Sequence, residues 1–437
     1  MRRTLTVIGV GLALAVSGGI GVATTSSDQA PRSPAGSVSA VVPNSGQDLE
    51  ASIAALQDTL RRVPDDYVSW ATLAVAYVEQ ARLSGNTTYY DKADEAVDRS
   101  FSIEPDENFT ALASRAAINA ARHDFSGALT DAEAALAINS RHLGALAIRV
   151  DALNELGRYD KQMRALRTAD RLQPSTPIAA RYSYAFELRG DLGQASAILL
   201  RASKGNGSRA DKAYTLTLRA DILRKQGRLA EAGRDLAIAQ DAVPTYLPAL
   251  VSSARLQTAR GDLEGAVTTW QEVVRRQPLP EYLTELGELF LHLGRTDEAD
   301  AQFAVVRTTI QLLESSGVRS DLETALFEAD HGSPTRALTQ ARAEWKQRTS
   351  VHVADALAWA LHRNGRDRAA LKITRAATRL NSPEAKFWIH RGTIEAALGM
   401  TSEARTHLQY GLDLDPGLSP WQRSEARETL SRIPADR

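Results

Sequence analysis

The stretch KQGRLAEAGRDLAIAQDAVP, from Lys225 to Pro244, contains a pattern that returns through most of the chain. A glycine is followed by a few polar residues and then, five positions on, by an alanine, as with Gly227 and Ala232. The same arrangement recurs in GDLEGA (261–266) and GRTDEA (294–299). Glycine adopts left-handed backbone angles at little cost, so its regular return indicates a repeated backbone turn.

The repeat has a period near 34 residues. Glycines stand at positions 157, 190, 227, 261, 294, 332, 365 and 399, in steps of 33 to 38. Each is followed five residues later by alanine, except that Gln162 follows Gly157. Extending the register backward brings in Ala128 and Ala93, with His123 in place of a turn glycine. This self-similarity predicts about ten stacked structural repeats.

Composition narrows the fold class and the possible functions. Hydrophobic residues make up 43% of the 437 residues and aromatic residues only 6%, so alanine and leucine must supply most of the core. Such a core favours closely packed helices over a sheet sandwich. The formal net charge of -1 gives no indication of nucleic-acid binding. The chain has no cysteine, which excludes disulfides, thiol catalysis and Cys-ligated metals.

The N-terminus has the layout of an export signal. Arg2 and Arg3 precede an apolar segment, and small residues follow up to Ala23. We expect residues 1–23 to be a signal peptide cleaved after Ala23, the alternative being an uncleaved membrane anchor. Residues 24–46, rich in Ser, Pro and Gly, are expected to be a disordered linker. The protein is therefore expected to be exported, either secreted or associated with the cell envelope. Its 44 arginines against eight lysines are typical of a GC-rich bacterial source.

The repeat carries further residues at fixed positions. Trp70, Leu73, Ala74 and Tyr77 have the spacing Trp-x2-Leu-Ala-x2-Tyr. A later repeat contains Leu283, Leu286, Gly287 and Phe290, followed by Ala299 and Phe303, and another closes with Ala266, Trp270 and Pro278. With the period of 34, this pattern resembles the tetratricopeptide repeat family.

The resemblance implies an all-α fold, a right-handed superhelical solenoid of antiparallel helix pairs. In each pair the glycine ends helix A, the alanine lies near the crossing with helix B, and a proline such as Pro244 ends helix B. We expect the array to span residues 47–416 and a capping helix with a tail to span 417–437, with Trp421 and Leu430 covering the last apolar face. The longer steps predict loops at 204–212 and 315–321, and 84–90 is a further extension.

No residue pattern indicates an enzyme. The histidines show no His-Glu-x-x-His spacing, and no glycine belongs to a phosphate-binding loop. On the segment around Trp359, Asp355 and His362 lie seven residues apart, about 10.5 Å along a helix, too far to hold one metal ion together. Asp330 and His331 are interpreted as a polar helix terminus. We therefore expect no catalytic residue, cofactor or metal.

Binding is expected in the concave groove. In the family the inward-facing positions of helix A fall ten, six, three and two residues before the turn glycine. We call these the inner positions. The groove candidates carried over to this chain are Asp151, Asn154, Tyr184, Glu187, Asp221, Arg224, Lys225, Arg255, Glu288, His292, Asp355, Trp359 and His362.

The functional prediction is a non-enzymatic scaffold that binds a protein or peptide outside the cytoplasm. Some family members hold C-terminal carboxylates in a clamp of lysine, arginine and asparagine, but Asn154 is the only asparagine among the candidates. The mixture of acidic and basic candidates favours a longer peptide of mixed charge. Two alternatives remain open: a module that binds a cell-envelope glycan or small ligand by stacking on Trp359 and Tyr184, and a docking subunit of an enzyme system.

Overall fold

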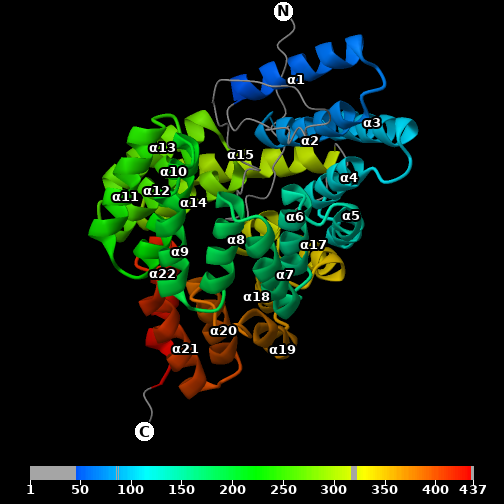
Figure 1. Cartoon of the computed structure of the whole chain (residues 1–437). Coiled ribbons are helices and arrows are strands. Elements are labelled where there is room, and N and C mark those ends of the chain that lie inside the picture. Colours follow the sequence, from blue (N-terminus) through cyan, green and yellow to red (C-terminus); the bar gives the residue numbers. More distant parts are fainter. Residues whose placement is uncertain (1–45, 85, 87, 316–321, 435–437) are drawn as a thin grey trace, which may run out of the picture. The chain divides into compact units, whose positions relative to one another are not determined.

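The computed structural model describes residues 46–84, 86, 88–315 and 322–434, and all regular structure in these ranges is α-helical (Figure 1). The predicted signal peptide (1–23) and all of the predicted linker except Gly46 lie outside the described residues, as do positions 316–321 of a predicted loop. No helix in the described ranges is long and apolar enough to cross a bilayer.

In the described ranges the helices form ten consecutive A/B pairs, preceded by one helix and followed by another. The first helix is α1 (Gly46–Arg62) and the last is α22 (Pro420–Arg432). The first five pairs are α2 (Tyr67–Ser84) with α3 (Thr88–Ile103), α4 (Phe109–Ala121) with α5 (Phe125–Ile138), α6 (Leu143–Glu155) with α7 (Tyr159–Leu172), α8 (Thr176–Glu187) with α9 (Leu192–Ser203), and α10 (Arg209–Lys225) with α11 (Leu229–Ala242). The other five are α12 (Leu247–Ala259) with α13 (Leu263–Arg276), α14 (Pro280–His292) with α15 (Thr296–Ser315), α16 (Leu322–His331) with α17 (Pro334–Gln347), α18 (Val351–Arg363) with α19 (Asp367–Ala377), and α20 (Ala385–Ala397) with α21 (Thr401–Leu414). The prediction of about ten repeats in an all-α solenoid is confirmed.

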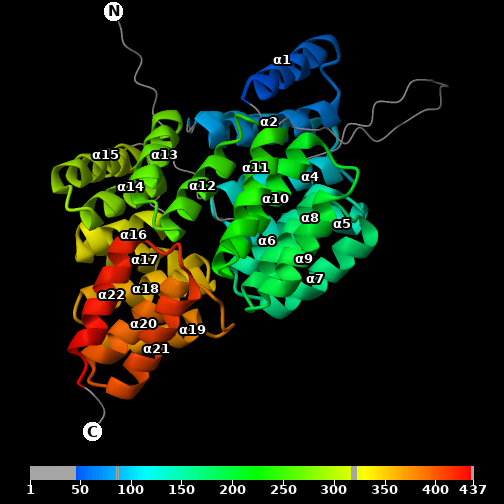
Figure 2. The ribbon, with the colours of Figure 1, turned by 90° about the vertical axis from the view of Figure 1, so that its left-hand side faces the viewer.

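The chain divides into two compact units. Unit 1 comprises residues up to Arg181 together with Gly205–Asp211, and unit 2 comprises Tyr182–Lys204 and Lys212–Arg437. The division therefore passes through α8 and α10. Within unit 1, α2 contacts α4 and α4 contacts α6, so successive A helices are neighbours. The same neighbour rule links α14, α16, α18 and α20 in unit 2 (Figure 2).

The turn between helix A and helix B explains the recurring glycines. Seven of the eight have positive φ angles between 66° and 79°, and His123 adopts the same conformation with a φ of 62°. At Gly227 the amide of the following Arg228 donates to the carbonyl of Leu223, so the turn satisfies carbonyls that helix A leaves unpaired. Gly332 differs because its φ is not positive. There the amide of Ser333 donates to the Glu328 carboxylate and starts α17.

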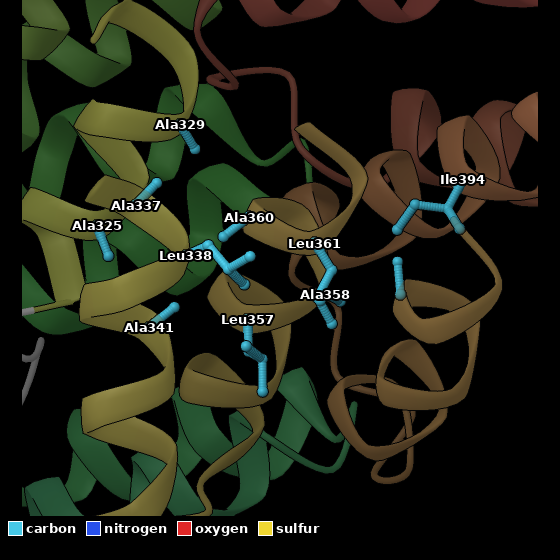
Figure 3. Packing of buried hydrophobic residues seen from close by; sticks show 11 residues of the cluster. Ala325, Ala329, Ala337, Leu338, Ala341, Leu357, Ala358, Ala360, Leu361 and Ile394 are labelled. Carbon is cyan, nitrogen blue, oxygen red and sulfur yellow. The ribbon is translucent and has the colours of Figure 1, made fainter. Parts of the chain in front are cut away.

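The alanine five residues after the glycine lies at the crossing of the two helices. All nine of these alanines are completely buried, and Gln162, the exception in sequence, is 1% exposed. The Gln162 amide fits because its Nε2 donates to Asn154 Oδ1 of helix A at 3.1 Å. Neighbouring pairs then bury their apolar faces against each other. Figure 3 shows alanines of α16 and α17 packed with leucines and alanines of α18 and with Ile394 of α20.

Prolines and insertions place the helix ends. Helix α1 and five B helices end two residues before a proline, as predicted; α11, for example, ends at Ala242 before Pro244. The loop expected at 204–212 is shorter, because α10 begins at Arg209. Ser208 and Asp211 exchange hydrogen bonds of 3.0 Å between side chain and backbone, forming a capping box that starts α10.

The turn glycines provide a test of backbone strain separate from packing. A Cβ would fit at both Gly227 and Gly193: at Gly227 it would meet nothing within 4 Å, and at Gly193, in α9, it would make one ordinary contact. The two positions differ in that only Gly227 has a positive φ. We expect Gly227→Ala to destabilise the α10–α11 pair by about 1 kcal/mol, because only its backbone angle is unfavourable. Gly193→Ala should instead stabilise its helix by up to about 1 kcal/mol. Hydrogen exchange of local amides measures both, and equal effects would contradict the turn explanation.

Candidate functional site

In unit 1 the two candidate residues hold helices together. Arg181 of α8 donates hydrogen bonds of 2.8 and 2.6 Å to the carboxylate of Asp151 on α6. Asn154 is 4% exposed, and its amide bonds to Glu155 as well as to Gln162. Neither side chain is free to receive a ligand without breaking these bonds.

The Asp151 contact between one helix A and the next recurs at two further places in the array. The repeated pairs are Asp151 with Arg181, Asp221 with Ser252 at 2.8 Å, and Arg255 with Glu285 at 3.2 and 2.5 Å. The first residue of each pair stands six positions before its turn glycine, and its partner stands nine positions before the next. The alternation of acid and base at the inner positions therefore reflects bonds between repeats.

A second set of contacts joins the beginning of unit 2 to its end. Arg224 on α10 forms a buried ion pair with Asp415, which follows α21. The neighbouring Lys225 Nζ lies 2.9 Å from Glu187 of α8 and 3.1 Å from Glu384, the residue before α20. The contacts with Asp415 and Glu384 span 191 and 159 positions of the chain. Helices α8 and α10 are thus tied to the last pair of unit 2.

A tyrosine of α8 forms a further contact with the C-terminal part of unit 2. The Tyr184 hydroxyl on α8 lies 2.9 Å from Nε2 of His352 on α18. The His352 ring also packs edge-on against Phe387 of α20, with centroids 5.1 Å apart. The phenol of Tyr184 is consequently held by the protein itself.

The buried ion pairs keep their charges. Burial raises the pKa of the Asp415 carboxyl, but Arg224 and Lys225 outweigh burial and hold that pKa below its ordinary value. Burial likewise opposes the charged form of Glu384, yet Lys225 keeps its pKa low. For Lys225 burial lowers the pKa, and the carboxylates of Glu187 and Glu384 more than reverse this effect and raise it. Lys225, Glu384 and Asp415 are therefore charged at neutral pH.

A third contact lies between α14, α16 and the C-terminal helix α22. Glu288 of α14 is 3% exposed, and its Oε1 lies 3.2 Å from Nε2 of His331 and 3.3 Å from Nε2 of Gln422. The His331 ring stacks on Phe303 with centroids 4.3 Å apart and also contacts Trp421 at 4.7 Å. Burial raises the pKa of Glu288, but the hydrogen bond from His331 and the charge of Lys386 lower it overall.

Only the rim of this contact is open. His292, at the end of α14, is exposed, and its Nδ1 lies 3.4 Å from the hydroxyl of Ser424 on α22. The predicted cap is thus correct in part. Leu430 of α22 packs on the apolar cluster of α20 and α21, whereas Trp421 points to His331.

Trp359 joins three successive A helices. Its indole NH donates to Asp330 of α16 at 2.7 Å, and its ring stacks on His390 of α20 with centroids 4.1 Å apart. His390 is fixed in turn by Asp355 at 3.0 Å. Burial raises the pKa of Asp330. Packing between repeats therefore accounts for Trp359, which is not a bare platform for stacking a sugar.

The histidines on and beside α18 each bond to a different side chain. His362 on α18 lies 2.6 Å from Asp367 of α19, and burial lowers its pKa. Asp355 pairs with His390, and His352 with Tyr184, so the polar residues of α18 have three separate partners. Within the described ranges no group of three His, Asp or Glu side chains is placed to hold a metal ion.

Many of the groove candidates are buried and bonded within the protein. Arg224, Asn154, Glu288 and Asp355 are all at most 5% exposed and bonded within the protein. Asp415, the partner of Arg224, Glu384, the partner of Lys225, and His331 and Gln422, the partners of Glu288, were not among the sequence candidates. Pair contacts across more than 130 residues leave no trace in local spacing. His331 was recognised in sequence only as part of a polar helix terminus.

These features define a helical-repeat protein in which many side chains at the inner positions are bonded to side chains of other helices. Residues 252–308, from α12 to α15, match the family model of the tetratricopeptide repeat. This segment is therefore identified as a tetratricopeptide repeat. No curated protein sequence is significantly similar to it.

Several solved structures resemble the chain at low identity. A thermophilic tetratricopeptide-repeat protein of Thermus thermophilus shares 21% identity over 43% of this chain and 98% of its own, with a TM-score of 0.37. A tetratricopeptide repeat protein of Parabacteroides merdae shares 20% over 59% of this chain and 97% of its own, with a TM-score of 0.34. Human IFIT1, solved as a dimer with PPP-AAAA, shares 15% over 84% and 87%, with a TM-score of 0.45. Such low identities transfer no partner or activity.

The contribution of the Arg224–Asp415 ion pair to stability can be tested by removing one of its two partners. Asp415→Ala should destabilise unit 2 by about 3 kcal/mol, because it leaves a buried guanidinium without its main partner. Adding Arg224→Met should recover much of the loss. Urea unfolding followed by tryptophan fluorescence measures the change, since Trp70 is the only tryptophan in unit 1. Glu272→Ala, which removes an exposed ion pair with Arg275, is the control and should have little effect.

The lowered pKa values of these carboxyl groups predict that unit 2 loses folding stability at low pH. A lowered folded-state pKa means that Asp415 and Glu384 stabilise the fold above their unfolded-state pKa of about 4, and that this contribution disappears as pH falls through the lowered values. Asp330, with its raised pKa, acts in the opposite sense. We expect the urea midpoint of unit 2 to decline below about pH 4 and to decline less steeply in Asp415→Asn. If the urea midpoint of that variant falls with pH as steeply as that of the unchanged protein, Asp415 contributes nothing to the loss of stability in acid.

Proposed function

We propose that this protein is a non-catalytic scaffold that acts outside the cytoplasm. It binds a protein or peptide partner on the surface formed by the inner positions of its A helices, which we call the inner surface. The observation that carries the proposal is the array of ten helix pairs, since such arrays present long rows of side chains on rigid supports. The tetratricopeptide repeat at 252–308 supports a role in protein interaction. The polar inner side chains serve packing, so no set of them is assigned to catalysis.

The internal ion pairs change what the partner should look like. Mixed charge at the inner positions indicated a partner of mixed charge, but Arg255, Asp221 and Lys225 are neutralised within the protein. Recognition is then left to the inner side chains that remain exposed, such as His292 and Arg363. The partner is expected to be chosen by shape and by a few polar contacts, with modest dependence on salt.

The proposed compartment depends on residues 1–23, which have the charged start, apolar middle and small-residue exit of an export signal. The absence of cysteine is compatible with any redox environment. A fusion of residues 1–46 to a reporter that is active only after export would test this part separately, with Arg2 and Arg3 changed to glutamate as the control.

Site-specific crosslinking tests the inner surface. Arg363 lies at an inner position of α18 and Arg368 lies on α19 of the same pair, and both are exposed. A photoreactive residue at Arg363 should crosslink a discrete protein in the host, while one at Arg368 should not, because the partner occupies the inner surface only. Equal yields at the two positions, or a product at Arg368 alone, would contradict binding at the inner surface.

A further inference from the structure

The helix α22 has two contact faces with different chemistry. Ala426 and Leu430, with Ile433 just beyond the helix, pack in one apolar cluster with Leu408 and Leu412 of α21. This face continues the stack and acts as the expected cap. It is joined to the array through the short segment between α21 and α22, where Asp415 accepts from the amide of Gly417 at 2.7 Å.

The other face of α22 lies on the inner surface of α14 and α16. Trp421 contacts His331, which is itself stacked on Phe303, so three rings form a column at the start of the helix. Beside this column Gln422 reaches Glu288. A tryptophan in contact with a buried aromatic group is the kind of anchor that dominates affinity at protein interfaces.

The fit of α22 is incomplete in its first turn. Gln422 Nε2 donates to Glu288 at 3.3 Å, but the Oε1 atom of Gln422 is buried with no hydrogen-bond partner. A buried acceptor without a partner weakens an interface. Glu288 is a buried carboxylate, and Asp330 and Glu285 lie near the same lysine, Lys386. A cation in place of the Gln422 amide would remove the unpaired acceptor and bond more strongly to Glu288.

We propose that the surface under α22, formed by α14 and α16 and by the adjoining apolar face of α21, is a docking site for a helix from a partner protein, and that α22 is its built-in occupant. The partner helix would carry an aromatic residue followed directly by arginine or lysine, with apolar residues five and nine positions after the aromatic one. These positions correspond to Trp421, Gln422, Ala426 and Leu430. The proposal rests on the proposed scaffold function and names the chemistry of its partner.

A tethered occupant sets the affinity that a partner must exceed. Because α22 is attached through only a few residues, its effective concentration at the site is of the order of millimolar. A free peptide identical to α22 therefore competes poorly, whereas one that corrects the Gln422 mismatch competes better. The absence of cysteine from the chain allows α22 to be locked in place by two introduced thiols.

The test uses the full chain with His292→Cys and Ser424→Cys, whose parent side chains lie 3.4 Å apart at the rim. Fluorescent peptides of residues 417–434, in the native sequence and with Gln422→Arg, are titrated and followed by anisotropy. With the thiols free, the Gln422→Arg peptide should bind about tenfold more tightly than the native peptide. Once a short bismaleimide joins the two thiols, both peptides should lose binding. A Trp421→Ala peptide should not bind in either state.

Hydrogen exchange supplies a second measurement. Adding the Gln422→Arg peptide should accelerate exchange of the chain's own α22 amides, because the helix leaves the site, and the crosslinked chain should show no such change. Equal binding before and after crosslinking, or no binding of any peptide with α22 unchanged, would overturn the proposal. If the peptides fail but crosslinking from Arg363 still captures a protein, the scaffold function stands and only the α22 site is rejected.

Discussion

The close crossing of helix A and helix B at a buried alanine is the contact on which the whole array depends. A larger side chain at this point would separate the two axes, and the apolar faces of both helices would then no longer match the neighbouring pair. The nine fully buried alanines and the left-handed turn that leads to most of them act together, because the turn fixes where helix B begins and the alanine fixes how near it comes. Gln162 shows how an exception is tolerated, through a hydrogen bond to Asn154.

Features fixed by neighbours in sequence could be predicted, since they depend on local rules. Pro244 lacks an amide donor, so α11 must stop before it. Gly227 adopts a positive φ because the turn requires it, and His123 shows that another residue can take the same turn. Gly332 does not follow the rule because Ser333 and Pro334 start α17 in another way. The shortened loop before α10 could have been foreseen from Ser208 and Asp211, a three-residue spacing that caps helices.

The position of each residue in the repeat predicted which side chains lie on the inner surface. It did not predict which partners those side chains bond to. Several side chains six residues before a turn glycine do meet the next helix A, as Asp151 and Arg255 show. Their partners, and still more the contacts of Arg224 with Asp415 and of Glu288 with Gln422, depend on how the pairs of unit 2 curve back on one another. That curvature is the sum of small rotations between many pairs, and no single residue encodes it.

The buried charges of unit 2 do more to select one arrangement than to strengthen it. Removing Lys225 and its two carboxylates from water opposes folding, and the attraction between them roughly offsets this. An apolar contact would tolerate a small slip between the first and last pairs, whereas Lys225 must lie within reach of both Glu187 and Glu384. The same reasoning applies to Glu288, whose carboxylate accepts from His331 of the array and from Gln422 of α22. Because the Oε1 atom of Gln422 has no hydrogen-bond partner at this contact, the group that α22 supplies to Glu288 can be replaced by a better donor, and the site under α22 is the place where we propose that a partner helix binds.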